Sequence, residues 1–208
     1  MHDVMREFFF SVPFFYHDVE NAQDLNRKLV HDILKWKERD EDGIIRSNHM
    51  GWHSEDDMQD RHEFQELTKI IHDVQNKICE AEEYNSEKKL VIDSMWANVS
   101  QKYAYNSYHY HPNSLWSGVY YVQCPPDCGQ IVFGTRQVLT YPEPDYKKDM
   151  IDRQPHQWTK VEYKPIEGRV IIFPSHVGHE VFQNLTDVEG QEGYRISISF
   201  NSLQIKEK

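Results

Sequence analysis

The spacing of apolar residues changes near Lys89, and this change limits the folds open to the chain. Before Lys89 the apolar residues follow two helical stripes separated by a polar loop, RSNHMGWHSED: Leu25, Leu29, Val30, Ile33 and Leu34, then Phe64, Leu67, Ile70, Ile71, Val74 and Ile78. Asn21 is the predicted N-cap of the first helix. After Lys89 come short runs typical of strands, punctuated by Pro and Gly: LVIDSMWANVS, GVYYV, QIVF, RVIIF, HEVF and YRISISF. We therefore expect a helical part over residues 1–88 and a sandwich or closed barrel over residues 89–201, with the helices packed on one face of the sheet.

Length and charge exclude several classes of function. A chain of 208 residues fits a single domain over residues 1–208. Lys and Arg number 23 against 34 Asp and Glu, a net charge of −11 without any basic cluster, which argues against nucleic-acid partners and anionic membrane surfaces. No apolar run approaches the roughly 20 residues of a membrane span, and no signal peptide is recognisable, so we expect a cytoplasmic protein. The three cysteines, Cys79, Cys124 and Cys128, lack the spacing of a zinc knuckle and are predicted to be reduced thiols.

Three histidines have the spacing of metal ligands. His109 and His111 lie two residues apart in YHYHPNS, so on a strand both side chains project to the same face and can converge on one ion. His179 stands at the start of a later predicted strand and is the candidate third ligand. Alone, the H-x-H pattern is more typical of two partly exposed histidines near a strand end.

The strand YRISISF predicts an anion site. Arg195 and Ser197 share one face of this strand, whereas its apolar residues Ile196, Ile198 and Phe200 share the other. Burying an arginine is costly without a partner, and a planar guanidinium is suited to binding a carboxylate through two hydrogen bonds.

The order of these residues resembles that of the iron- and 2-oxoglutarate-dependent oxygenases. GRVIIFPSHVGHEV and YRISISF are similar to the strand pair of prolyl hydroxylases that carries an iron ligand and the 2-oxoglutarate-binding arginine. SNHMGWHS, MWANVS and HYHPNSLWSGVYYV resemble a subgroup of uncharacterised phage and bacterial oxygenases with an H-x-H-P motif, so the similarity spans about residues 47–201. The resemblance implies a mainly β protein: a double-stranded β-helix, or jelly roll, with N-terminal helices packed on one sheet.

The resemblance also implies a role for each matching residue. His109 and His179 correspond to iron ligands. Arg195 corresponds to the residue that pairs with the C5 carboxylate of 2-oxoglutarate, and the hydroxyls of Ser197 and Tyr121 contact the same anion. The implied cofactors are Fe(II), 2-oxoglutarate and O2. The implied reaction hydroxylates a C–H bond of a small-molecule or peptidyl, for example prolyl, substrate and releases succinate and CO2.

The sequence departs from the family pattern at one position. His111 stands where the family's H-x-D/E motif has a carboxylate. Three interpretations follow: His111 is itself the third ligand, the pair is shifted to His111 and Asn113, or a carboxylate from elsewhere completes the site. We favour three histidines, His109, His111 and His179, because nitrogen donors suit Fe(II). A three-histidine zinc site for hydrolysis or hydration, and a jelly-roll binding module without activity, remain as alternative functions.

Five further residues are weaker candidates for the pocket or its rim. Trp96 and Asn98 share one face of a predicted strand, although a tryptophan there is more often part of the core. His49 and His53 lie in the predicted GWHS loop, where histidines are usually solvated, and His176, three residues before His179, is interpreted as a rim residue.

Overall fold

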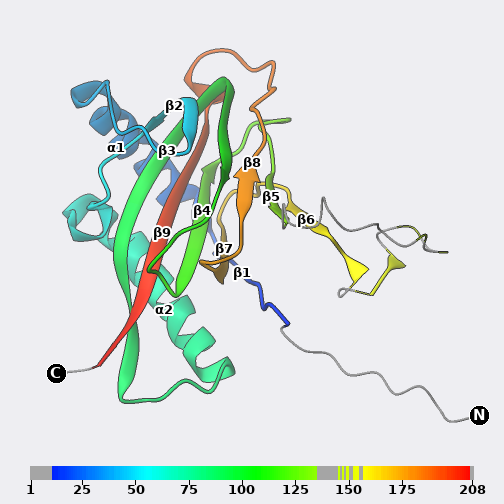
Figure 1. Cartoon of the computed structure of the whole chain (residues 1–208). Coiled ribbons are helices and arrows are strands. Elements are labelled where there is room, and N and C mark those ends of the chain that lie inside the picture. The colour runs from blue at the N-terminus through cyan, green and yellow to red at the C-terminus, as the bar shows by residue number, and fades with distance from the viewer. Residues whose placement is uncertain are drawn as a thin grey trace, which may run out of the picture.

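The computed structural model of this chain describes residues 11–134, 145, 147, 149, 152–154 and 157–206. It is a curled antiparallel sheet flanked by two long helices (Figure 1). This confirms the predicted jelly-roll class. The elements in chain order are β1 (Phe15–Asp18), α1 (Ala22–Arg39), β2 (Asn48–His53), η1 (Met58–Asp60), η2 (His62–Phe64), α2 (Gln65–Ala81), β3 (Lys88–His109), β4 (Trp116–Gln123), β5 (Ile131–Gly134), β6 (Lys160–Tyr163), β7 (Arg169–Pro174), β8 (His179–Val181), η6 (Gln191–Gly193) and β9 (Arg195–Lys206).

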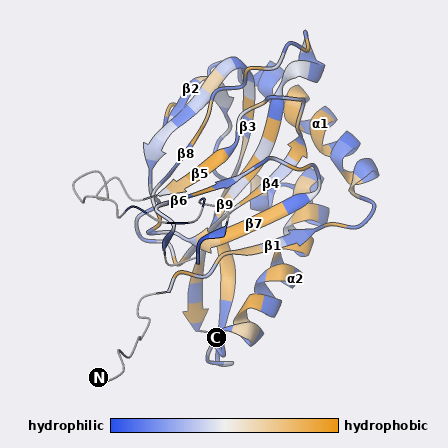
Figure 2. Ribbon diagram, turned by 90° about the vertical axis from the view of Figure 1, so that its right-hand side faces the viewer, coloured by the Kyte–Doolittle hydropathy of each residue, from blue (hydrophilic) through white to orange (hydrophobic). Residues whose placement is uncertain are grey.

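The long strand β3 joins the two layers of the sheet. The strand order is β1-β7-β4-β9-β3-β8-β5-β6, and β2 adds to β3. Residues 88–100 of β3 pair with β9, whereas Asn106 and His109 pair with β8. Tyr103, at φ 71, lies between these two stretches, where the strand changes partners. Helices α1 and α2 lie on one side of the β7-β4-β9-β3 layer, and β2, β8, β5 and β6 lie on the other (Figure 2).

One face of this layer packs against the helices, and the opposite, concave face does not. Ile196, Ile198 and Phe200 on β9 are fully buried against the apolar stripes of α1 and α2. Two polar contacts fix the helices on the sheet: the Tyr120 hydroxyl donates to the Asn26 side chain at 2.5 Å, and the Gln75 amide donates to Ser202 at 2.5 Å. The opposite, concave face is therefore free to carry a site.

The N-terminal part differs from the sequence prediction in two respects. Asn21 does not cap α1 with its side chain, because it adopts a left-handed conformation at φ 52 and ψ 37. The segment predicted as a polar loop contains β2, which pairs with β3 and approaches it closely at Gly51. The polar and glycine residues of β2 hide the strand period, and its backbone pairing with a distant strand determines its conformation.

Gly118 in β4 lies against the ring of Phe200. A Cβ atom at this position would come within 2.2 Å of Phe200 Cζ. Replacing Gly118 with Ala is expected to lower the free energy of unfolding by roughly 1–3 kcal/mol, because overpacking forces the core to shift. Chemical denaturation measures this loss. In a Phe200→Leu background, where the ring is absent, Gly118→Ala is expected to cost less stability than it does in the wild type. An unchanged unfolding midpoint in the single variant Gly118→Ala would contradict the packing argument.

Candidate active site

The three predicted metal ligands lie side by side. His109 ends β3 and pairs in register with His179, which begins β8. His111 follows two residues later, and its backbone N–H donates to Ser175 O at 3.0 Å. The ring centroids are 4.3 Å apart for His109 and His179, 5.1 Å for His109 and His111, and 5.2 Å for His111 and His179. One nitrogen from each ring lies within 4.8 Å of the other two.

The hydrogen bonds and the burial of the histidine rings suit metal binding. Nδ1 of His109 lies 2.7 Å from Ser107 O, and Nδ1 of His179 lies 3.2 Å from Val177 O. A carbonyl only accepts, so each Nδ1 carries the hydrogen and each Nε2 keeps its lone pair. Burial lowers the pKa of all three histidines, to about 4 for His111, and the rings are therefore neutral at pH 7. Three neutral nitrogen donors fit Fe(II).

The surroundings of His111 bear on the departure from the H-x-D/E pattern. No carboxylate belongs to the histidine cluster within the part of the chain that the structure describes. Asn113 lies in an exposed turn at φ 66. Asp56 lines the same cavity, but its half-exposed side chain pairs with Arg46 at 3.8 Å. The geometry thus favours His111 over Asn113 or Asp56 as the third ligand.

All six predicted site residues line one cavity of about 470 Å³ on the concave face of the sheet: His109, His111, Tyr121, His179, Arg195 and Ser197. The strand register explains this convergence. Ser197 lies between Asn98 of β3 and Tyr121 of β4, and Arg195 lies opposite Ser100 in the next row. Burial raises the pKa of Tyr121, so its phenol stays protonated and able to donate.

Arg195 carries a buried charge that has no carboxylate partner among the described residues. The residue is 1% exposed, and burial lowers the pKa of its guanidinium. Nη1 donates to the backbone carbonyls of Cys128, Gly129 (3.2 Å) and Phe182 (3.0 Å), and Nη2 donates to Ser100 Oγ at 3.2 Å. These oxygens are neutral, and no carboxylate interacts with Arg195 among the described residues. The charge is therefore available to an anion in the cavity.

Comparison with known proteins places this geometry in a family. The sequence model of a family described as "Putative 2OG-Fe(II) oxygenase" matches residues 94–201, which is more than half of the chain. The chain belongs to this oxygenase family. Its cofactors are accordingly Fe(II), 2-oxoglutarate and O2. No curated protein sequence matches the chain.

Solved oxygenase structures share the fold of this chain. A prolyl-4-hydroxylase of Pseudomonas putida is 14% identical to this chain, and the two superpose over 91% of each chain with a TM-score of 0.62. HygX of Streptomyces hygroscopicus, crystallised with nickel and 2-oxoglutarate, is 11% identical over 92% of this chain and 82% of its own, with a TM-score of 0.58. A prolyl hydroxylase of Trichoplax adhaerens, crystallised with a peptide fragment of hypoxia inducible factor, is 13% identical over 91% and 82%, with a TM-score of 0.58.

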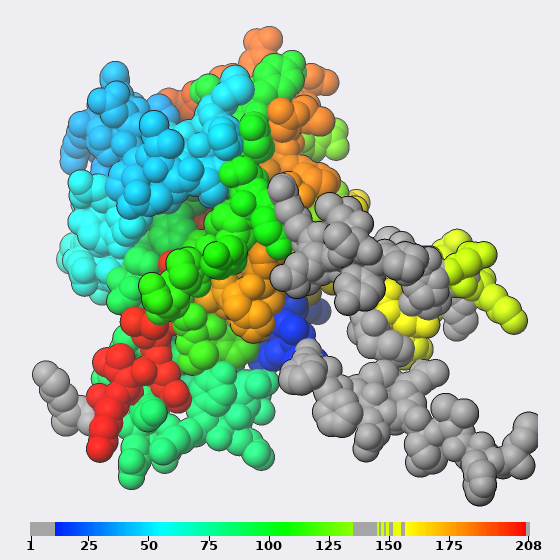
Figure 3. Space-filling view, viewed as in Figure 1, coloured from blue at the N-terminus to red at the C-terminus, as the bar shows by residue number. Residues whose placement is uncertain are grey.

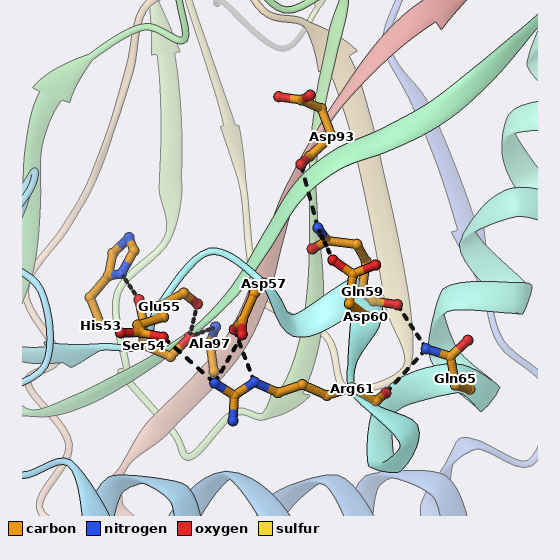
Figure 4. Close-up of polar contacts among 10 residues, drawn as sticks. All are labelled: His53, Ser54, Glu55, Asp57, Gln59, Asp60, Arg61, Gln65, Asp93 and Ala97. Atoms are coloured by element: carbon orange, nitrogen blue, oxygen red, sulfur yellow. Dashed lines mark hydrogen bonds and ion pairs between the residues drawn. The ribbon is translucent and has the colours of Figure 1, made fainter.

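The weaker candidates of this oxygenase separate into two groups. His53 stacks on Trp96 at 5.4 Å and both line the cavity, as does Asn98, whose buried Oδ1 has no partner among the described residues. His53 is held by its Nδ1 hydrogen bond to Ser54 O, and Ser54 is tied to Ala97 of β3 (Figure 4). By contrast, His49 stacks on Tyr105, and the exposed His176 borders a neighbouring groove.

Sequence reasoning missed several polar cavity residues, among them Ser47, Ser94 and Asn106. The alternation that places Trp96 and Asn98 on the concave face also predicts Ser94, so this signal was present. Ser47 and Asn106 carry no such pattern, because β2 and the distal half of β3 meet through long-range pairing.

Within the described residues, no helix of this oxygenase is long and apolar enough to cross a membrane.

Proposed function

We propose that this oxygenase is a hydroxylase that inserts oxygen into a C–H bond of its substrate while 2-oxoglutarate is converted to succinate and CO2. In this proposal His109, His111 and His179 hold Fe(II). Arg195 pairs with the distal carboxylate of 2-oxoglutarate, and the hydroxyls of Ser197 and Tyr121 donate to the same anion.

One observation carries the proposal: a cluster of three neutral histidines and an uncompensated buried arginine share a single cavity. A site for hydrolysis or hydration at zinc would use the histidines but leave the buried charge of Arg195 without a function. A dicarboxylate whose two ends bind at separate places accounts for both features.

The protein's own groups position the reactants. Bound iron, with 2-oxoglutarate and O2, supplies the oxidising power. The backbone carbonyls of Ser107 and Val177 keep the hydrogens of His109 and His179 on Nδ1, so that Nε2 stays available to the metal. The guanidinium of Arg195 is held in place by backbone carbonyls and so requires little reorganisation when an anion binds. The apolar side chains of Val119 and Phe173 in the cavity wall exclude water from the cosubstrate.

The substrate is proposed to be a small molecule or a peptide. Solved relatives include both kinds: the Trichoplax enzyme was crystallised with a peptide fragment, and HygX also with hygromycin B. The cavity wall beyond the histidines carries the stacked pair Trp96 and His53 and the polar side chains of Ser94 and Asn201. Such a lining favours a substrate with a flat or hydrogen-bonding group near the reacting carbon.

The test supplies 2-oxoglutarate and ¹⁸O2 to iron-loaded protein together with a small-molecule extract or a peptide library. A hydroxylase is expected to place one ¹⁸O in succinate and one in the product, which mass spectrometry detects, and zinc-loaded protein is expected to form neither. Labelled succinate with a product that has gained no ¹⁸O would contradict hydroxylation but keep the oxygenase. Absence of succinate with iron would remove the catalytic proposal altogether.

A further inference from the structure

Ser47, immediately before β2, touches the metal-binding face of His109. Its Oγ lies 3.5 Å from Nε2 of His109, the nitrogen that keeps the lone pair for the metal. The light-blue to cyan segment that leads into β2 lies against the green end of β3 in the space-filling view (Figure 3). Ser47 belongs to the SNHMGWHS motif, for which the cofactor assignment alone provides no function.

The position of Ser47 is fixed by its neighbours. Its backbone carbonyl accepts from the N–H of Ser107 at 2.9 Å, and the carbonyl of Ser107 in turn accepts from Nδ1 of His109. Asn48 fixes the preceding loop, because its Oδ1 accepts from the N–H of Arg46 at 2.7 Å and its Nδ2 donates to Ile44 O at 3.2 Å. The serine and the metal ligand therefore form one rigid unit.

The hydrogen-bond partners determine where the Ser47 hydroxyl hydrogen points. Asn106 Nδ2 donates to Ser47 Oγ at 3.2 Å, so this contact occupies a lone pair and leaves the hydroxyl hydrogen free. The hydrogen is directed at Nε2 of His109, which can only accept. Once a metal takes the lone pair of Nε2, the hydroxyl hydrogen needs another acceptor on the same face.

The charge of the site indicates what that acceptor is. Three neutral imidazoles leave the full 2+ charge of the ion, whereas the H-x-D/E pattern cancels one charge with a carboxylate. A metal in this cluster consequently has an increased attraction for an anionic ligand. A hydrogen bond to a charged acceptor is stronger than one between neutral groups.

We propose that Ser47 is a metal-site residue that donates a hydrogen bond to an anionic ligand of the ion bound beside His109, and so selects anions at this coordination position. The inference rests on the proposed three-histidine metal site. In this proposal the SNHMGWHS segment supplies a hydrogen-bond donor beside the metal site.

The test uses cobalt(II) as the metal and azide as the anionic probe, followed by the visible absorption of cobalt. Ser47→Ala is expected to weaken azide binding roughly tenfold, the loss expected for one hydrogen bond to a charged ligand. Ser47→Thr, which keeps the hydroxyl, is expected to restore most of the affinity. The matched control is Ser199→Ala, because Ser199 lines the same cavity but contacts Asn98 instead of the histidines. Cobalt affinity is expected to be equal in all four proteins.

Unchanged azide affinity in Ser47→Ala overturns the inference. A tenfold loss of cobalt affinity in the same variant also overturns it, because Ser47 then acts as a direct ligand or holds the loop in place. Failure of the proposed metal site is recognised separately: wild-type protein then takes up no cobalt, or keeps it fully in His179→Ala. In that case the inference fails together with the site.

Discussion

Replacing His179 with Ala is expected to abolish stoichiometric metal binding. The ring of His179 is 4% exposed, faces His109 across the β3–β8 pair and supplies one of the three clustered nitrogens. Without it, the remaining pair, His109 and His111, leaves a two-nitrogen site open to water, and such a site holds Fe(II) weakly. Metal analysis after anaerobic loading with Fe(II) and desalting is expected to show close to one equivalent in the wild type and less than about a tenth in the variant.

The matched control is His176→Ala. His176 lies three residues earlier in the same segment, but it is exposed and outside the cluster. This variant is expected to retain the full metal content. If His179→Ala also keeps its metal, the ligand assignment is wrong even though the fold stands; if His176→Ala loses the metal, the two histidines have been assigned the wrong way round.

Much of the fold follows from local patterns in the sequence. The apolar stripes of α1 and α2 and the β-branched runs of β4, β7 and β9 repeat with the correct period, and the glycines and prolines mark the turns between the later strands. Strand β2 lacks such a pattern. Gly51 and the polar residues around it form a strand only because β3 offers its backbone edge, and that contact spans about fifty residues of sequence.

The site could be predicted where side chains carry the chemistry and where the strand period sets their direction. His109 and His111 are two residues apart, and Arg195 and Ser197 are two residues apart, so each pair shares a face. Three of the four oxygens that hold Arg195 were not predictable, because they are backbone carbonyls of Cys128, Gly129 and Phe182. Any residue type offers a carbonyl, so only the folded chain shows which ones converge.

The choice of His111 as a ligand likewise depends on which groups converge in the folded chain. The sequence leaves His111, Asn113 and a distant carboxylate as alternatives. The structure brings the ring of His111 to 5.2 Å from that of His179 and leaves Asn113 in an exposed turn. The proposed site therefore has one negative charge fewer than the usual pattern, which increases the importance of nearby donors such as Ser47.

Arg195→Ala is expected to weaken 2-oxoglutarate binding by roughly 2–5 kcal/mol, the cost of truncating one partner of a buried charge pair. The distal carboxylate of 2-oxoglutarate would then lie in the cavity without a cation, since no other arginine or lysine lines the cavity apart from Arg46 at its mouth, within the residues that the structure describes. Titration calorimetry on manganese-loaded protein measures the affinity. Metal binding should survive, because the histidines keep their own contacts with Ser107 and Val177.

Two controls separate loss of the anion contact from loss of structure. Arg169→Ala removes an arginine from β7 of the same sheet whose partner is Asp18, outside the cavity, so it should leave the affinity unchanged. Arg195→Lys keeps the positive charge but loses the planar fork, so its affinity should lie between those of the wild type and Arg195→Ala. Thermal unfolding of each variant shows whether the fold persists when Cys128 O and Phe182 O lose their donor. Equal affinities in wild type and a folded Arg195→Ala would mean that 2-oxoglutarate does not bind at Arg195, and the buried charge would then require another anion.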